Sequence, residues 1–133
     1  MNIKTNIIDL RVEEDRYKKI APSNPDYNEL KKFFLKVLVR NNIQEYDNVG
    51  INCYSSYQFL YTELICHILK EEFPEINIII GGYHPTACPE DFKNKESLYD
   101  FIIQGEAELS LLKIFFLPFK WCLKSSLINW SSK

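Results

Sequence analysis

Short apolar runs alternate with longer amphipathic segments along most of this chain. Three runs, at residues 49–53, 76–80 and 101–103, are rich in β-branched or aromatic side chains and are each followed by turn-forming residues. Such runs are typical of strands buried in a parallel sheet. A further short run, Ile7-Ile8-Asp9-Leu10, predicts another strand near the N-terminus. The pattern therefore predicts about four strands.

The intervening segments have helical periodicity. Helices are predicted at 26–39, at 57–73 and at 107–116, and a short helical turn is predicted from Pro89. The second helix has an expected core-facing stripe of Leu60, Leu64, Ile68 and Leu69. Ser55, with Gln58 three residues later, matches a capping box at its start. Strand and helix alternate, which predicts an α/β fold with a wound parallel sheet and right-handed crossovers.

Composition narrows the class of protein. The 133 residues fit one domain over 1–116, followed by a tail at 117–133 without clear periodicity. The net charge of −2, with both signs interspersed, argues against a nucleic-acid partner.

No apolar run approaches the ~20 residues that span a bilayer, and the N-terminus does not resemble a signal peptide. We therefore expect a cytoplasmic protein without a membrane partner. Its four cysteines contain no Cys-x-x-Cys pair, which favours ordinary reduced thiols.

Three of the expected strands end in turns suited to close contact with a ligand. These turns are Tyr54-Ser55-Ser56, residues 81–86 (Gly-Gly-Tyr-His-Pro-Thr) and Gly105-Glu106. Parallel strands bring such turns to one edge of the sheet, where ligands of open α/β folds bind. Each turn also has a purely structural explanation, since Ser55 can cap a helix, Gly105 can simply allow a turn, and His84 can be an ordinary loop residue. The prediction of a binding site depends on the three turns occurring together.

Common cofactor motifs are missing from these turns. The chain contains neither Gly-x-Gly-x-x-Gly nor a Walker loop, so a nicotinamide cofactor or a nucleoside triphosphate is not expected. No nucleophile and base can be assigned from the sequence, and pairing Cys88 with His84 would depend only on their proximity along the chain. We therefore expect no catalytic residue.

Taken in order, three segments resemble the cobalamin-binding domain at the front of cobalamin-dependent radical SAM enzymes. The segments are Asp47 to Cys53, Ile78 to Glu90 with its Gly-Gly-Tyr-His-Pro-Thr turn, and Asp100 to Glu108. The resemblance implies a flavodoxin-like sheet with a corrinoid over its carboxyl edge and the nucleotide tail beside the sheet. The residues that would line this cofactor site are Tyr54, Ser55, Ser56, Gly81, Gly82, His84, Thr86, Gly105 and Glu106.

The chain also departs from that family. It lacks the Asp-x-His-x-x-Gly motif that supplies an axial histidine to cobalt in some relatives, so His84 is not expected to be a metal ligand. It also lacks the Cys-x-x-x-Cys-x-x-Cys motif of radical SAM domains, so we expect no iron–sulfur cluster and no catalysis by this chain on its own. The parent family would be radical SAM methyltransferases or related enzymes, with the radical SAM domain on a separate chain.

The run at residues 7–10 resembles the family's second strand, which implies a shortened domain without the first strand-helix unit. Such a domain would be either a stand-alone cobalamin-binding module or a remnant of a cobalamin-dependent radical SAM enzyme. Two other functions stay open at this point. One is a degenerate α/β interaction domain that no longer binds a cofactor. The other is a different flavodoxin-like domain, such as a receiver or a flavin binder. A receiver needs a cluster of acidic residues at its strand ends, and Asp9 is the only such residue here.

Overall fold

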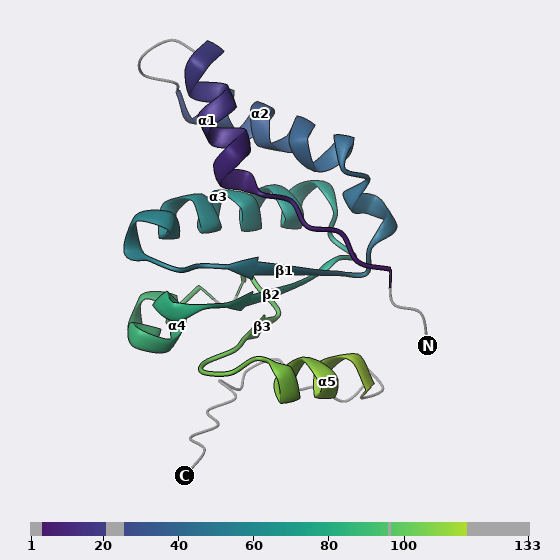
Figure 1. The fold of residues 1–133 in the computed structure, drawn as a ribbon, viewed down its shortest axis with the longest axis vertical. Coiled ribbons are helices and arrows are strands. Elements are labelled where there is room, and N and C mark those ends of the chain that lie inside the picture. Colours follow the sequence, from purple (N-terminus) through teal and green to yellow (C-terminus); the bar gives the residue numbers. More distant parts are fainter. Residues whose placement is uncertain (1–3, 21–25, 96, 117–133) are drawn as a thin grey trace. The chain divides into compact units, whose positions relative to one another are not determined.

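The computed structural model describes residues 4–20, 26–95 and 97–116 (Figure 1). By their internal contacts, the residues divide into two compact units, 1–45 and 46–133. The tail predicted at 117–133 lies outside the described residues.

In the first unit, the predicted N-terminal strand is wrong. Residues 4–9 have no regular secondary structure, Ile7 is 92% exposed, and helix α1 (Leu10–Ile20) begins where the strand was expected to end. Asp9 explains this start, because its carboxylate accepts hydrogen bonds from the backbone N–H groups of Arg11 (3.1 Å) and Val12 (3.2 Å). An aspartate in this position satisfies the unpaired donors of the first helical turn.

The predicted helix at 26–39 is confirmed as α2 (Tyr27–Arg40), followed by the short 3₁₀ helix η1 (Ile43–Glu45). Asp26 and Glu29 form a capping box at the start of α2. Within this unit, the largely buried carboxylate of Glu13 on α1 forms ion pairs with Arg16 at 3.0 Å and with Arg40 at 2.8 Å. This shared carboxylate links α1 to the end of α2.

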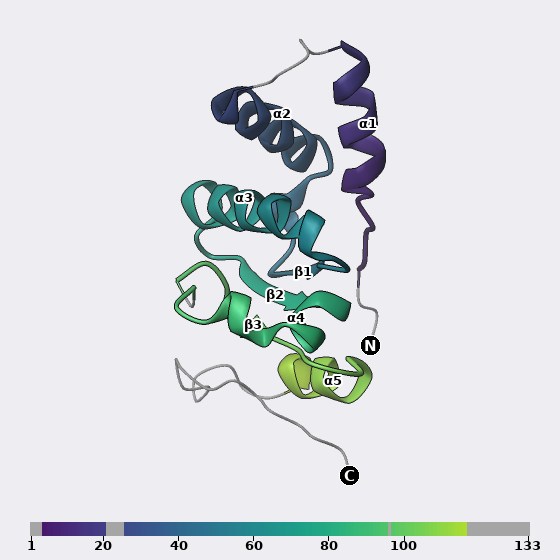
Figure 2. The same ribbon diagram turned by 90° about the vertical axis from the view of Figure 1, so that its left-hand side faces the viewer.

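The second unit confirms the predicted wound α/β fold. Its described residues form a three-stranded parallel sheet in the order β1-β2-β3. The strands are β1 (Asn48–Asn52), β2 (Asn77–Gly81) and β3 (Phe101–Ile102). The helical elements are α3 (Ser56–Glu72), α4 (Tyr83–Ala87), η2 (Pro89–Phe92) and α5 (Glu108–Phe116). Helices α3 and α5 lie on opposite sides of the sheet (Figure 2).

The central strand β2 supplies the middle of the core. Ile78, Ile79 and Ile80 are each at most 3% exposed, as expected for a strand with both faces covered. Ile79 packs with Ile103 and with Ile114 of α5, so this side chain belongs to the α5 face of the sheet. A strand alternates its side chains between its two faces, which directs Ile78 and Ile80 toward α3.

The structure confirms most of the core-facing stripe predicted for α3. Leu64, Ile68 and Leu69 are buried, but Leu60 is 71% exposed, so its predicted place in the core is wrong. The buried stripe follows Thr62, Ile65, Cys66 and Leu69. This i, i+3, i+4, i+7 spacing puts Leu60 on the far side of the helix. Across the described ranges, no helix is both long enough and apolar enough to cross a membrane.

Candidate cofactor-binding site

The structure brings the three predicted turns to the same edge of the sheet. Asn52 pairs with Gly81 and Ile80 with Ile102, so all three strands run in register to their carboxyl ends. The pairing continues past β1, where the backbone N–H of Cys53 donates to Gly81 O at 2.8 Å. The turns therefore start from neighbouring points on one rigid sheet.

Gly82 determines how closely the turn after β2 approaches β1. Its φ of 110° is a conformation that L side chains rarely adopt. A Cβ atom there would lie 2.3 Å from Asn52 Oδ1 and 2.8 Å from the carbonyl oxygen of Cys53. The backbone N–H of His84, two residues after Gly82, donates to that same Cys53 carbonyl at 3.0 Å. Only glycine allows this close crossing of the two turns.

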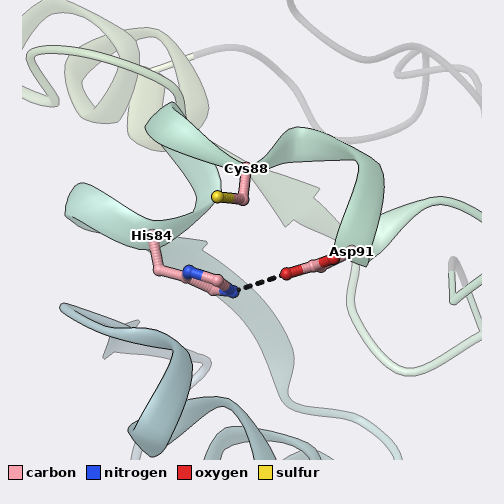
Figure 3. A group of neighbouring side chains, drawn as sticks. All are labelled: His84, Cys88 and Asp91. Carbon is pink, nitrogen blue, oxygen red and sulfur yellow. Dashed lines mark ion pairs between the residues drawn. The ribbon is translucent and has the colours of Figure 1, made fainter.

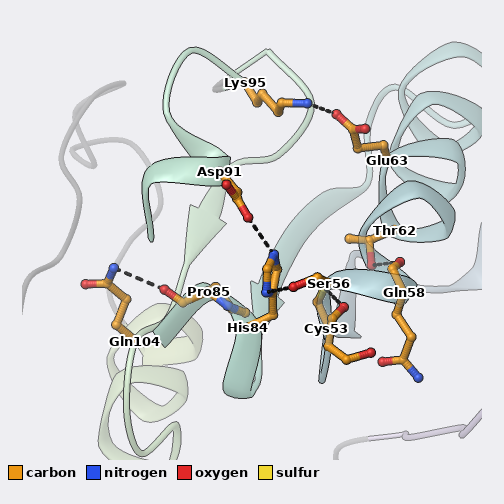
Figure 4. Close-up of polar contacts among 11 residues, drawn as sticks. Cys53, Ser56, Gln58, Thr62, Glu63, His84, Pro85, Asp91, Lys95 and Gln104 are labelled. Carbon is orange, nitrogen blue, oxygen red and sulfur yellow. Dashed lines mark hydrogen bonds and ion pairs between the residues drawn. The ribbon is translucent and has the colours of Figure 1, made fainter. Parts of the chain in front are cut away.

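Thr86 joins the turn after β2 to the turn after β3. Its hydroxyl donates to Gly82 O at 2.8 Å and accepts from the Gly105 N–H at 2.9 Å. Gln104 adds a contact from its side-chain amide to Pro85 O at 3.3 Å (Figure 4). Gly105 has a φ of 77°, and among the described atoms a Cβ there would meet nothing within 4 Å. The turn after β3 is thus anchored at its N–H group while its outer side stays open.

Two tyrosines give this edge an exposed aromatic surface. Tyr54 follows β1 and is 65% exposed, and Tyr83 opens α4 and is 66% exposed. Their ring centroids lie 5.9 Å apart with a 38° tilt. The sequence indicated Tyr54 as a site residue but not Tyr83, because their proximity arises from the packing of the two turns. We call Tyr54 and Tyr83 the tyrosine pair.

His84, by contrast, is buried beneath this edge, with only 3% of its surface exposed. Its Nδ1 lies 3.3 Å from Ser56 Oγ, and its Nε2 lies 2.9 Å from Asp91 Oδ2 (Figure 4). The rings of Phe59 and Phe92 pack against the imidazole, with centroids 5.6 and 5.7 Å away. The side chain of His84 is therefore engaged inside the protein and does not project from the turn.

The predicted capping box at the start of α3 is not formed. Ser55 has the extended backbone of an N-cap, but its side chain makes no capping hydrogen bond in the described structure. The Gln58 side chain accepts instead from the N–H of Tyr54 at 2.9 Å. Gln58 thus stabilises the turn after β1 one residue earlier than expected, while Ser56 is drawn inward toward His84.

Two cysteines next to this region are poor nucleophiles. Cys53 and Cys66 are 0% and 1% exposed. Burial raises the pKa of the Cys53 thiol, and it raises the pKa of Cys66 to about 12. Because the thiolate is the reactive form, both thiols are expected to be inert near neutral pH.

Comparison with known proteins identifies the family. Residues 34–114, more than half of the chain, match the model of the B12 binding domain. The chain belongs to this family, which confirms the resemblance seen in the sequence and accounts for the flavodoxin-like sheet.

One similar curated protein is the anaerobic magnesium-protoporphyrin IX monomethyl ester cyclase of Synechocystis sp. (strain ATCC 27184 / PCC 6803 / Kazusa). It is 35% identical over 54 residues, which cover 38% of this chain and 11% of the cyclase. The match thus spans about a tenth of that relative's length. No solved structure matches the chain.

Proposed function

We propose that this chain binds a corrinoid over the edge formed by the three turns. The observation that carries the proposal is the convergence of those turns on one sheet edge in a member of the B12 binding domain family. The residues fit such a ligand, because the tyrosine pair offers an exposed aromatic surface and the outer side of Gly105 is open. A large, mostly apolar macrocycle is well matched to an exposed aromatic surface of this kind.

The proposed contacts divide between the three turns. Tyr54 and Ser55 would contact the corrin or its nucleotide tail from the turn after β1. Gly81, Gly82 and Thr86 would let the tail approach the backbone of the second turn. Gly105 and Glu106, both exposed, would close the site from the third turn.

Ser56 and His84 support this surface from below. In the present conformation the imidazole faces Ser56 and Asp91, so we propose that it shapes the second turn and does not ligate the cobalt. This agrees with a sequence that lacks Asp-x-His-x-x-Gly. The protein would hold the corrinoid without supplying a histidine to its metal.

We further propose that catalysis belongs to a radical SAM partner. A bound corrinoid supplies a cobalt centre that can carry an alkyl group, and this chain's own contribution is to hold and orient it. Support comes from the order of the three segments in the sequence and from the similarity to the cyclase. The chain lacks the Cys-x-x-x-Cys-x-x-Cys motif such a partner would supply.

Corrinoid binding can be tested directly with the purified chain. After incubation with excess hydroxocobalamin and gel filtration, we expect the red corrinoid to elute with the protein. Replacing both Tyr54 and Tyr83 with alanine should weaken binding roughly tenfold, since aromatic contacts contribute about 0.5–1.5 kcal/mol each. Tyr27→Ala is the matched control, because Tyr27 is an exposed tyrosine at the start of α2.

A colourless protein peak with both components at tens of micromolar would contradict the proposal. Self-association of that colourless protein would favour the interaction domain, and a yellow protein on purification would favour a flavin binder.

A further inference from the structure

Three side chains with metal-binding atoms, one buried and two exposed, converge at the end of α4. They are His84 on α4, Cys88 between α4 and η2, and Asp91 on η2 (Figure 3). One nitrogen, one sulfur and one carboxylate oxygen all lie within 4.8 Å of one another. Cys88 and His84 are close along the chain, but Asp91 was not connected with them in the sequence, because the fold-back of η2 brings it to the histidine.

The buried nitrogen of this cluster is incompletely satisfied. His84 Nε2 is fully shielded from solvent and makes no hydrogen bond within the described residues. Asp91 Oδ2 is 2.9 Å away, within ion-pair distance but not aligned as a hydrogen-bond acceptor. A buried polar atom without a hydrogen bond destabilises the fold, so such an atom calls for a ligand or a function.

We propose that His84, Cys88 and Asp91 bind a divalent transition-metal ion of the Zn²⁺ class. Imidazole, thiolate and carboxylate are its usual protein ligands, and three of them with a water molecule complete a tetrahedral shell. Magnesium and calcium prefer all-oxygen shells, so a set with nitrogen and sulfur disfavours them.

The surroundings suit a site of this type. Ligand bonds of about 2.0–2.3 Å require the three donor atoms to approach to roughly 3.5 Å of one another. Cys88 is exposed and the Asp91 side chain is 49% exposed, so the thiol can move inward, the carboxylate can shift outward from its 2.9 Å contact with Nε2, and solvent can reach the fourth position. His84 is held between Phe59 and Phe92, and Ser56 Oγ at its Nδ1 orients the ring. A partner at the second ring nitrogen is a regular feature of metal-binding histidines.

This site shares only the supporting His84 with the proposed corrinoid surface, since it uses neither the tyrosine pair nor Gly105. The two proposals can therefore fail independently. A Cys88→Ser variant should keep its affinity for hydroxocobalamin, while the metal site loses its sulfur ligand.

The test uses the full chain, freed of metal with a chelator and of corrinoid, and titrated with Co²⁺ as a coloured substitute for Zn²⁺. We expect one Co²⁺ per chain, a near-ultraviolet thiolate-to-cobalt charge-transfer band and visible bands of tetrahedral cobalt, all removed by added Zn²⁺. Cys88→Ser should abolish the charge-transfer band, and Asp91→Asn should weaken Co²⁺ binding at least tenfold. Both positions are at the surface, so these variants avoid the unfolding that a change at buried His84 risks.

Matched controls are His67→Gln, which removes the exposed histidine of α3, and Cys122→Ser, which removes a thiol remote in sequence. Neither should change the spectrum. Failure to take up Co²⁺ at tens of micromolar would overturn the proposal and leave His84 and Asp91 as a simple ion pair. A charge-transfer band that survives Cys88→Ser, or equal affinity in Asp91→Asn, would overturn it as well.

Discussion

Tyr83 and His84 are neighbours in sequence but face opposite environments. Tyr83 is 66% exposed and pairs with Tyr54 on the outer surface of the sheet edge, while His84 is 3% exposed and lies among Ser56, Asp91 and two phenylalanines. The outer surface is open and aromatic, whereas the imidazole is enclosed and has polar groups near both ring nitrogens. The residue with the most versatile chemistry in the turn is thus the one least accessible to a large ligand.

The turn after β2 thus presents adjacent side chains to two different environments. Gly82 sets the direction of the chain, so that the next side chain points outward and the following one points inward. A change at Gly82 should therefore disturb both the tyrosine pair and the surroundings of His84. A change confined to one of these two regions should leave the other intact.

The largest effect is expected from Gly82→Ala. The added methyl group would overlap Asn52 and the Cys53 carbonyl and would hold φ in a strained region, which should lower the free energy of unfolding by about 2–4 kcal/mol. Gly50→Ala is the matched control, because among the described atoms a Cβ at Gly50 meets nothing within 4 Å. The stability of both variants can be measured by urea unfolding. Equal midpoints for Gly82→Ala and Gly50→Ala would contradict the steric role assigned to Gly82.

Thr86→Ala should have a smaller effect. It removes the hydroxyl that bonds to Gly82 O and to Gly105 N–H, at a cost of about 1 kcal/mol because Thr86 is exposed. Hydrogen exchange at the Gly105 amide should become faster. Thr86→Ser keeps the hydroxyl and should restore slow exchange, and failure to restore it would mean that the methyl group, not the hydrogen bonds, holds the turn.

The smallest effect concerns the buried Cys66. Its pKa is about 12 in the folded protein, against an ordinary value of 9.0. Below pH 9 both states keep the proton, but above pH 9 the unfolded thiol loses it first, so stability falls as the pH rises toward 12. Between pH 8 and 9.5 the expected loss is about 0.8 kcal/mol.

Cys66→Ala should lose less stability over that pH range than the parent protein, as measured by urea unfolding at both values. Cys88→Ala is the control, since Cys88 is exposed. The same alkaline loss in all three proteins would rule out Cys66 as its source.

Much of the fold could be predicted because local signals and tertiary packing agree. The isoleucines of β2 indicated a buried central strand, and glycines at the ends of β2 and β3 indicated the turns that follow these two strands. The prediction of a strand at residues 7–10 was wrong because Asp9 caps helix α1. The helix cap outweighs the weak strand preference of a short apolar run. The predicted burial of Leu60 was wrong because an apolar residue on a helix need not lie on the face that packs against the core.

The candidate site was predictable in its backbone and not in its side chains. Parallel strands necessarily bring their turns to one edge, so the three turns could be placed together from the sequence. The pairing of Tyr54 with Tyr83 and the approach of Asp91 to His84 depend on how α4 and η2 fold back over the sheet. No spacing in the sequence encodes these contacts.

The close approach at Gly82 has a consequence for how this site can vary. A single added carbon atom is excluded there, so the path of the turn cannot be altered by substitution without moving β1 as well. Tyr54 and Tyr83, with roughly two thirds of their surfaces exposed, carry no such restriction. On the proposed function, changes in ligand preference would therefore arise at the two aromatic positions, while the shape of the edge that presents them stays fixed.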